Sequence, residues 1–187
     1  MKTTDTLIII DTETGGLDPT VHSLLSIGLV TFDGSRRTEI FVREPEISTH
    51  PRSMKVNGID LDFIEREGLS PAATCDRVEA FFNATPGRRP VMLCGHNIAF
   101  DLAYMRRIYR LADRTPPAEF THRSVDTHAL LWALAAAGRI PMDATTSDGA
   151  FQYFNVQPPE ELRHTALGDA VATRDLLESL LEMMACE

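Results

Sequence analysis

An apolar, mostly β-branched run near the start of the chain, residues 7–10, is followed at once by Asp11-Thr12-Glu13. The run shows no polar alternation, which predicts a strand buried on both faces of a sheet. Residues two apart in an extended segment point to the same face, so Asp11 and Glu13 would project together from the strand end. Two carboxylates this close are costly to bury unless a cation neutralises them. The strand therefore predicts a sheet with an acidic site where it ends.

The next segments predict an antiparallel start to that sheet. Residues 24–32 form the expected second strand, Asp33-Gly34 is a hairpin turn signal, and residues 38–42 alternate as a third strand. Short strands are expected at residues 90–94 and at a segment ending at Val125. Helices are expected at residues 51–56, 71–83, 98–111, 127–137, 146–154 and 165–184, with Ser70 and Asp126 as N-caps and Gly138 as a stop. This order predicts a mixed sheet flanked by helices, an α/β or α+β domain.

Length and composition fit one globular domain over residues 1–187. The longest wholly apolar run, residues 129–137, has nine residues, whereas a membrane-spanning helix needs roughly 20. The polar N-terminus and the short apolar run after it do not resemble a secretory signal. Three cysteines, Cys75, Cys94 and Cys186, lack zinc-site spacing and are odd in number. We therefore expect free structural thiols, no membrane association and a reducing, cytoplasmic location.

The net charge of −9 argues against a protein that coats nucleic acid electrostatically. It does not argue against an enzyme that binds a chain end through metal ions, because cations that fill a carboxylate cluster make it locally positive. Among the basic residues only Lys2 and Lys55 are lysines. Four arginines crowd one segment and two precede another: Arg106, Arg107, Arg110 and Arg114, and Arg88-Arg89. These could grip a phosphate backbone or form solvated helix faces.

A second motif, His96-Asn97-Ile98-Ala99-Phe100-Asp101, follows the expected strand at residues 90–94 and opens a helix. Asp101 would lie in the first turn, where the helix dipole stabilises an anion. Its carboxylate could then reach a metal between sheet and helix. The alternative is that Asn97 caps the helix and Asp101 merely supplies favourable first-turn charge.

The third motif runs from His164 to Asp169. His164 lies where the last helix should begin, and Asp169 follows on a helical surface of small residues. Lone histidines are usually surface residues or satisfied core residues, which we expect for the remaining ones outside the second motif, namely His22, His50, His122 and His128. His164 differs from them because of the motif around it.

In this order and at these spacings, the three motifs resemble the DEDDh branch of the DnaQ-like 3′–5′ exonucleases. That family includes the proofreading subunit of bacterial replicative polymerase, ribonuclease T and oligoribonuclease. The resemblance spans residues 7–172. The sister branch has a tyrosine four residues before the last aspartate, and that position is Thr165 here. The resemblance implies a ribonuclease H-like fold: a mixed five-stranded sheet, with three antiparallel strands and then parallel strands, flanked by helices.

The resemblance also implies roles for individual residues. Four carboxylates would hold two Mg²⁺ or Mn²⁺ ions per active site, ions that prefer hard oxygen ligands: Asp11, Glu13, Asp101 and Asp169. His164 would be the general base. Leu17 looks like the family's wedge against the terminal bases. Further contacts to substrate would come from Thr12, Thr14, Asn57, His96 and Asn97, where Asn57 replaces the histidine that is commoner at its position.

The implied reaction is hydrolysis of the terminal phosphodiester bond, releasing nucleoside monophosphates from nucleic acid with a free 3′ end. We expect single-stranded DNA as substrate. The alternatives are a 3′–5′ exoribonuclease acting on RNA ends or short oligoribonucleotides, a non-catalytic module that binds nucleic-acid ends, and a structural calcium cluster. The chain has no EF-hand loop, and it keeps all five catalytic residues, which disfavours the last two. We expect a free-standing enzyme or a homodimer rather than a subunit tethered to a DNA polymerase.

Overall fold

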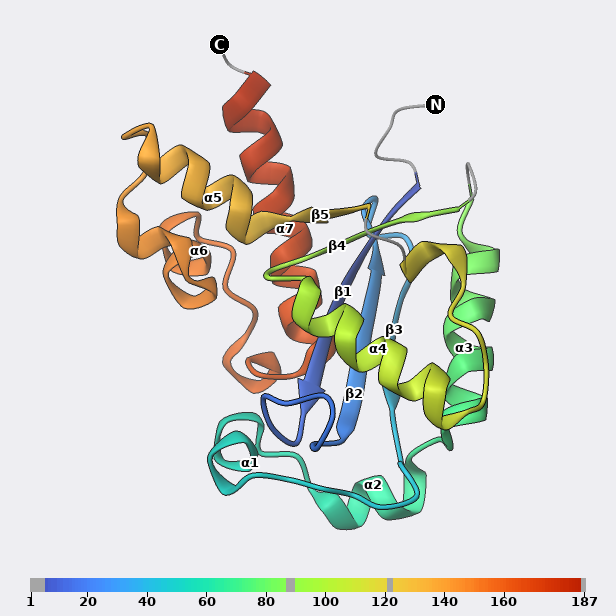
Figure 1. Cartoon of the computed structure of the whole chain (residues 1–187). Coiled ribbons are helices and arrows are strands. Elements are labelled where there is room, and N and C mark those ends of the chain that lie inside the picture. Colours follow the sequence, from blue (N-terminus) through green and yellow to red (C-terminus); the bar gives the residue numbers. More distant parts are fainter. Residues whose placement is uncertain (1–5, 87–89, 121–122, 186–187) are drawn as a thin grey trace.

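The computed structural model describes residues 6–86, 90–120 and 123–185, and its centre is a five-stranded sheet (Figure 1). The sheet has the order β3-β2-β1-β4-β5. Its first three strands pair antiparallel, and β4 and β5 add parallel to β1. The strands are β1 (Leu7–Thr14), β2 (Leu24–Thr31), β3 (Arg37–Phe41), β4 (Met92–Gly95) and β5 (Ser124–Asp126). The predicted mixed five-stranded sheet is confirmed.

The first strand is longer than its apolar run. β1 continues through both acidic residues to Thr14 because β2 pairs with it along this whole stretch. Asp11 lies opposite Gly28, and Glu13 lies opposite Ser26. Asp11 and Glu13 are thus part of the strand and share one of its faces.

Seven helices flank the sheet in the described part of the chain: α1 (Pro51–Asn57), α2 (Leu61–Glu67), α3 (Pro71–Ala84), α4 (Ala99–Leu111), α5 (Thr127–Ala136), α6 (Ser147–Tyr153) and α7 (Ala166–Ala185). Short 3-10 turns cover Ala118–Phe120, Met142–Thr145 and Glu160–Leu162. α2 was not predicted. Its N-cap is Asp60, whose carboxylate accepts from the Asp62 N–H.

The capping predictions had mixed outcomes. Ser70 caps α3 and Asp126 caps α5, each through its side chain. The alternative that Asn97 caps the next helix is wrong, since the N-cap of α4 is Ile98, without a side-chain hydrogen bond. Asn97 instead adopts a left-handed conformation, with φ of 60°, and its backbone N–H donates to the carboxylate of Asp126.

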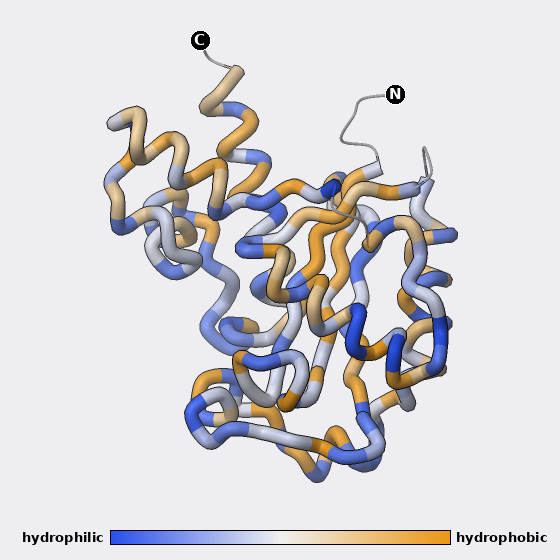
Figure 2. Tube along the Cα trace, viewed as in Figure 1, coloured by the Kyte–Doolittle hydropathy of each residue, from blue (hydrophilic) through white to orange (hydrophobic). Residues whose placement is uncertain are grey.

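Helices cover both faces of the sheet. On one face, Ile8 and Ile10 of β1 share a core with residues of α3 and α4. On the other face, Leu7 and Ile9 share a core with Leu177 of α7. A third core lies among α5, α6 and α7. Figure 2 shows the strands as the most apolar part of the chain, within more polar helices. This pattern agrees with the absence of polar alternation in the first strand.

One glycine lets α7 approach the sheet. A Cβ at Gly28 would lie 2.1 Å from the carbonyl oxygen of Ala166, the first residue of α7. No side chain fits between them. The first turn of α7 therefore sits directly on β2, beside the strand that carries Asp11.

Most of the arginine-rich segment is engaged within the protein. Arg107 pairs with Glu44, Arg114 pairs with Asp76 and Glu79, and Arg106 donates to a backbone oxygen. These three guanidinium groups are therefore engaged by other residues of the protein, and the interpretation of the segment as a grip on a phosphate backbone is not supported for them. Arg88, Arg89, His122 and Cys186 lie outside the described residues. Cys75 and Cys94 are buried free thiols, as predicted. Among the described residues, no helix is long and apolar enough to cross a bilayer.

Candidate active site

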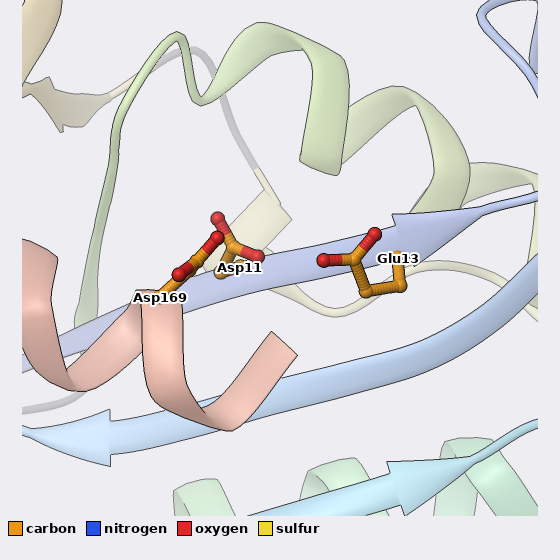
Figure 3. A group of neighbouring side chains, drawn as sticks. All are labelled: Asp11, Glu13 and Asp169. Carbon is orange, nitrogen blue, oxygen red and sulfur yellow. The ribbon is translucent and has the colours of Figure 1, made fainter. Parts of the chain in front are cut away.

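Three carboxylates converge where β1 meets the start of α7 (Figure 3). Asp11 and Glu13 from β1 and Asp169 from α7 each place a carboxylate oxygen within 4.8 Å of the others. Among the described residues, this is the one group of three or more acidic, histidine or cysteine side chains with metal-binding proximity. Oxygen ligands of this kind suit Mg²⁺ or Mn²⁺.

The fourth predicted carboxylate approaches from the opposite side of the strand. Asp101, in the first turn of α4, is only 4% exposed. The Thr12 hydroxyl donates to its Oδ1 at 2.7 Å. Asp101 is not a member of the three-carboxylate group, but it is close enough that its charge raises the pKa of Asp11. The structure thus brings all four acids to one region, three of them in mutual contact range.

Burial makes the carboxylates of this cluster hard to ionise. It is the largest cause that holds the pKa of Asp11 well above its usual range, and the charges of Asp101 and Asp169 add to it. Burial likewise raises the pKa of Glu13 to about 8 and that of Asp101 to about 7. Neutral acids are poor metal ligands, whereas a bound divalent cation favours their charged form. The donor set therefore fits a divalent cation.

Arg163 is a neighbour of the acidic cluster that the sequence did not reveal. Its Nη1 donates to Oδ1 of Asp169 at 2.5 Å, and its Nη2 pairs with Asp148 of α6. The guanidinium carbon lies 5.2 Å from the ring centre of Phe151. Burial raises the pKa of Asp169, and the charge of Arg163 opposes that rise. The only sequence signal was its position next to His164.

His164 lies directly before α7 in an uncommon backbone conformation, with φ of 61°. A residue with a Cβ is strained there. The turn is fixed on both sides: the Thr165 N–H donates to the Leu162 carbonyl at 3.3 Å, and the Thr165 hydroxyl caps the N–H of Gly168 at 3.0 Å. His164 is half-buried, and its charge influences the pKa of Asp169. The histidine is thus held close to the acidic cluster.

The predicted substrate residues divide into two groups. Next to the cluster, the Thr14 hydroxyl donates to the Gly16 carbonyl at 2.7 Å, and the Asn57 side chain donates to the Thr14 carbonyl at 3.1 Å. Asn57 also hydrogen-bonds Glu13, which lowers the pKa of that carboxyl against the effect of burial. Leu17 lies in the adjacent loop and is 81% exposed, the most exposed large apolar side chain among the described residues.

The second group lies at the ends of β4 and β5. Nδ1 of His96 is 3.2 Å from the Thr127 hydroxyl, and its ring packs edge-on against His128 at 5.4 Å. Burial lowers the pKa of His96 to about 4, so the ring is neutral near pH 7. The structure directs this side chain towards α5 and not into the three-carboxylate group. Asn97, next to it, is exposed.

The other described histidines make ordinary structural contacts. His22 accepts from the Asp18 N–H, and His50 caps α1 through Nδ1. Nδ1 of His128 lies 2.9 Å from the Thr145 carbonyl oxygen. They agree with the interpretation of lone histidines as surface or satisfied residues, and they leave His164 as the histidine associated with the acidic cluster.

Fold and site together define a class: an α/β protein whose central strand ends in partly buried carboxylates suited to divalent cations. The model of the exonuclease family RNase_T matches residues 8–177. The chain belongs to this exonuclease family, which confirms the predicted resemblance. The match covers every motif residue from Asp11 to Asp169.

Individual relatives agree with the family. The chain is 32% identical over 183 residues to a "DNA polymerase III subunit epsilon-like protein" of Rhodobacter capsulatus, a match covering 94% of this chain and 24% of that protein. It is 26% identical over 106 residues to the "3′-5′ DNA exonuclease Cap18" of Escherichia coli, covering 56% of this chain and 57% of that protein. The chain thus spans between a quarter and three fifths of these relatives.

A solved structure has the same fold. The nuclease domain of 3′hExo, described as a DEDDh family member bound to rAMP, superposes with a TM-score of 0.74 at 16% identity. The alignment covers 95% of this chain and 92% of that domain. The predicted ribonuclease H-like exonuclease fold is therefore confirmed.

Proposed function

We propose that this chain is a metal-dependent 3′–5′ exonuclease that hydrolyses the terminal phosphodiester bond of nucleic acid and releases nucleoside monophosphates. The observation that carries this proposal is the convergence of Asp11, Glu13 and Asp169 within 4.8 Å, in a chain of the exonuclease family. The nearby Asp101 completes four acids whose burial needs a counter-charge.

The four carboxylates would hold two Mg²⁺ or Mn²⁺ ions. When bound, such a pair supplies the positive charge that stabilises the attacking and the leaving oxygen of an in-line displacement. Thr12 orients Asp101 through its hydroxyl, and Arg163 orients Asp169. These contacts restrict the carboxylates to the directions from which a shared ligand can be reached.

His164 is the proposed general base. Its imidazole would accept the proton of the attacking water, and the strained turn before α7 would hold it at the edge of the acidic cluster. Asp101 and Glu13 are poor alternatives for this step, because as metal ligands they are required in the charged form throughout. His164 is the remaining titratable side chain that the motif places there.

Single-stranded DNA is the proposed substrate. Cap18, a relative that is similar in sequence, is named as a DNA exonuclease. The nuclease domain of 3′hExo, which is bound to rAMP, is similar to this chain in fold alone. The exposed Leu17 would pack against the terminal bases, and the backbone at Thr12 and Thr14 would line the terminal nucleotide. Asn57 would contact the terminal nucleotide, and His96 and Asn97 would contact the strand further from the cluster.

We propose that the enzyme is free-standing or homodimeric and that it is located in the cytoplasm. The two buried free thiols fit a reducing compartment. Association with a DNA polymerase is the alternative, because one relative is named as a polymerase subunit epsilon-like protein.

The test uses 5′-labelled single-stranded DNA and RNA of matching sequence, each incubated with Mg²⁺, Mn²⁺ or EDTA. We expect a ladder that shortens from the 3′ end, faster on DNA, and abolished by EDTA and by Asp11→Asn. Faster cleavage of RNA would make the chain an exoribonuclease. A folded protein that binds the strand but shortens neither would be an end-binding module.

A further inference from the structure

We infer that Tyr104 and Arg107 are positioning residues: from one face of α4 they fix the loop that presents Leu17, and so set where the terminal bases lie relative to the acidic cluster. The loop in question covers residues 15–23, between β1 and β2. The inference rests on the proposed exonuclease function and adds two residues to its machinery that none of the three motifs singles out.

The loop around Leu17 is rigidly held although its tip is in solvent. The two ends of the loop are joined by a hydrogen bond from the Gly15 N–H to the Ser23 carbonyl at 2.7 Å. Within the loop, the His22 N–H donates to the Asp18 carbonyl at 2.8 Å. A Cβ at Gly16 would lie 2.2 Å from the ring of His22, so the two halves of the loop are in direct contact. Leu17 thus projects from a fixed base.

α4 supplies the contacts that connect this base to the rest of the site. The buried Tyr104 hydroxyl donates to the Gly16 carbonyl at 2.7 Å, directly before Leu17. Nη1 of Arg107 donates to the Pro19 carbonyl at 3.1 Å, two residues after it. The two contacts therefore bracket the exposed leucine.

The direction of the Arg107 side chain is set by a buried partner. Nε and Nη2 of Arg107 donate to the Glu44 carboxylate, at 2.7–3.1 Å, and the Leu24 N–H donates to the same carboxylate at 3.0 Å. The Glu44 side chain is 1% exposed. A buried ion pair often stabilises a fold no more than apolar residues of similar size would. The Glu44 carboxylate does, however, hold the Arg107 guanidinium group in one orientation, and in that orientation Nη1 reaches the Pro19 carbonyl of the loop.

Position along α4 relates the loop to the acidic cluster. Asp101, Tyr104 and Arg107 follow one another at intervals of three residues, which places them along one side of the helix. The first approaches the three-carboxylate group, and the other two hold the loop. A single rigid helix therefore sets the spacing between the carboxylates and Leu17.

A purely structural role would predict something different. If the contacts only stabilised the fold, their loss would affect every substrate equally. If they position Leu17, their loss should weaken binding of a strand with stacked terminal bases and leave hydrolysis of a single-nucleotide ester intact, since such an ester has no neighbouring base to meet the leucine.

The experiment compares Tyr104→Phe and Arg107→Lys with wild type on two substrates. One is a single-stranded DNA oligonucleotide, and the other is the p-nitrophenyl ester of thymidine 5′-monophosphate. Tyr104→Phe removes one hydroxyl and keeps the buried ring. Arg107→Lys keeps the charge but not the planar fork. The matched control is Arg114→Lys, which alters an ion-paired arginine that faces α3 and not the loop.

We expect each variant to raise KM for the oligonucleotide about five- to tenfold, the range for loss of one or two hydrogen bonds, with kcat within twofold of wild type. On the ester, kcat/KM should stay within twofold, and Arg114→Lys should match wild type on both substrates. The double variant Tyr104→Phe with Leu17→Ala should have the same KM for the oligonucleotide as Leu17→Ala alone, because both changes act on the contact of Leu17 with the terminal bases.

Equal losses on both substrates, or an additive double variant, would show a structural role and overturn the inference, as would an unchanged KM for the oligonucleotide. Wild-type protein that cleaves neither substrate would instead overturn the proposed function.

Discussion

Two groups of charged side chains meet α4, one near each of its ends, and their charges are balanced in opposite ways. At Glu44 and Arg107, each charge has a partner of opposite sign and further hydrogen bonds to the backbone. In the acidic cluster, three carboxylates face one another with Asp101 nearby, and among the described residues Arg163 is the one basic side chain that forms an ion pair with them. The first group is satisfied by the fold itself. The second needs positive charge that the described residues do not supply, which is the expected property of a site that recruits metal ions.

The largest effect is expected when one carboxylate is removed from the acidic cluster, because this tests whether the cluster lacks positive charge. Asp11→Asn should reduce exonuclease activity by about 10⁴-fold or more, beyond the range typical of losing a general base, because a cation is then misplaced. The same change should raise the melting temperature of the metal-free protein by about 2–4 °C, the shift for roughly 1 kcal/mol in a chain of this size. Single-turnover assays and calorimetry in EDTA measure the two effects. Asp143→Asn, at an exposed acid, is the control. A destabilised Asp11→Asn would contradict the electrostatic account.

The second prediction separates the base from the ligands. His164→Ala should lower kcat by about 10²–10⁴-fold while leaving metal binding intact, because the four carboxylates remain. Mn²⁺ titration by calorimetry and steady-state kinetics provide the two readouts. His128→Ala, at an exposed histidine, should behave as wild type. Activity of His164→Ala close to wild type would remove His164 from the mechanism.

The third prediction concerns the satisfied pair. Glu44→Gln leaves Arg107 buried without a charged partner, and we expect a loss of about 3–5 kcal/mol in the free energy of unfolding. Glu79→Gln, at a partly exposed pair with Arg114, should cost only about 0–1 kcal/mol. Urea denaturation measures both. Similar losses for the two variants would mean that burial does not distinguish these pairs.

The smallest effect is a pH dependence of the metal-free protein. The pKa of Glu13 is raised to about 8 and that of Asp101 to about 7 in the folded protein. At pH values between the lower pKa of each group in the unfolded chain and its raised pKa in the folded protein, the folded state binds more protons than the unfolded state. Stability should therefore be greatest at low pH within this window and should fall as pH rises from about 5 to 8. Added Mg²⁺ should flatten the curve, because it stabilises the charged carboxylates. Melting temperatures with EDTA or Mg²⁺ across this range provide the test, and a rise of stability with pH in EDTA would contradict it.

The sequence predicted those parts of the site that depend on local geometry. Asp11 and Glu13 could be assigned to one face because they are two apart in a strand, and Asp169 to a helix start because of its small neighbours. The mixed sheet followed from the order of the apolar runs and a turn signal, and the family resemblance added its five strands. α2 was missed although its N-cap, Asp60, is a residue type that favours helix starts.

Contacts between distant segments were beyond the sequence. Arg107 meets Glu44 across 63 positions, and Arg163 reaches Asp148 and Asp169 only because two helices converge. The alternative that Asn97 caps a helix was wrong: its backbone is left-handed, and its N–H donates to Asp126, from a different strand. Side-chain partners of this kind are set by tertiary packing, which a pattern of residue types does not encode.

The close approach of α7 at Gly28 has a consequence for sequence variation. Since the Ala166 carbonyl fills the space of any Cβ there, even alanine would displace the turn that leads to Asp169. Glycine is therefore required at this position, although Gly28 belongs to none of the three motifs. In another protein with these three motifs, a larger residue at the position opposite the first aspartate would push the start of the last helix away from the sheet. Its third carboxylate would then lie further from the other two.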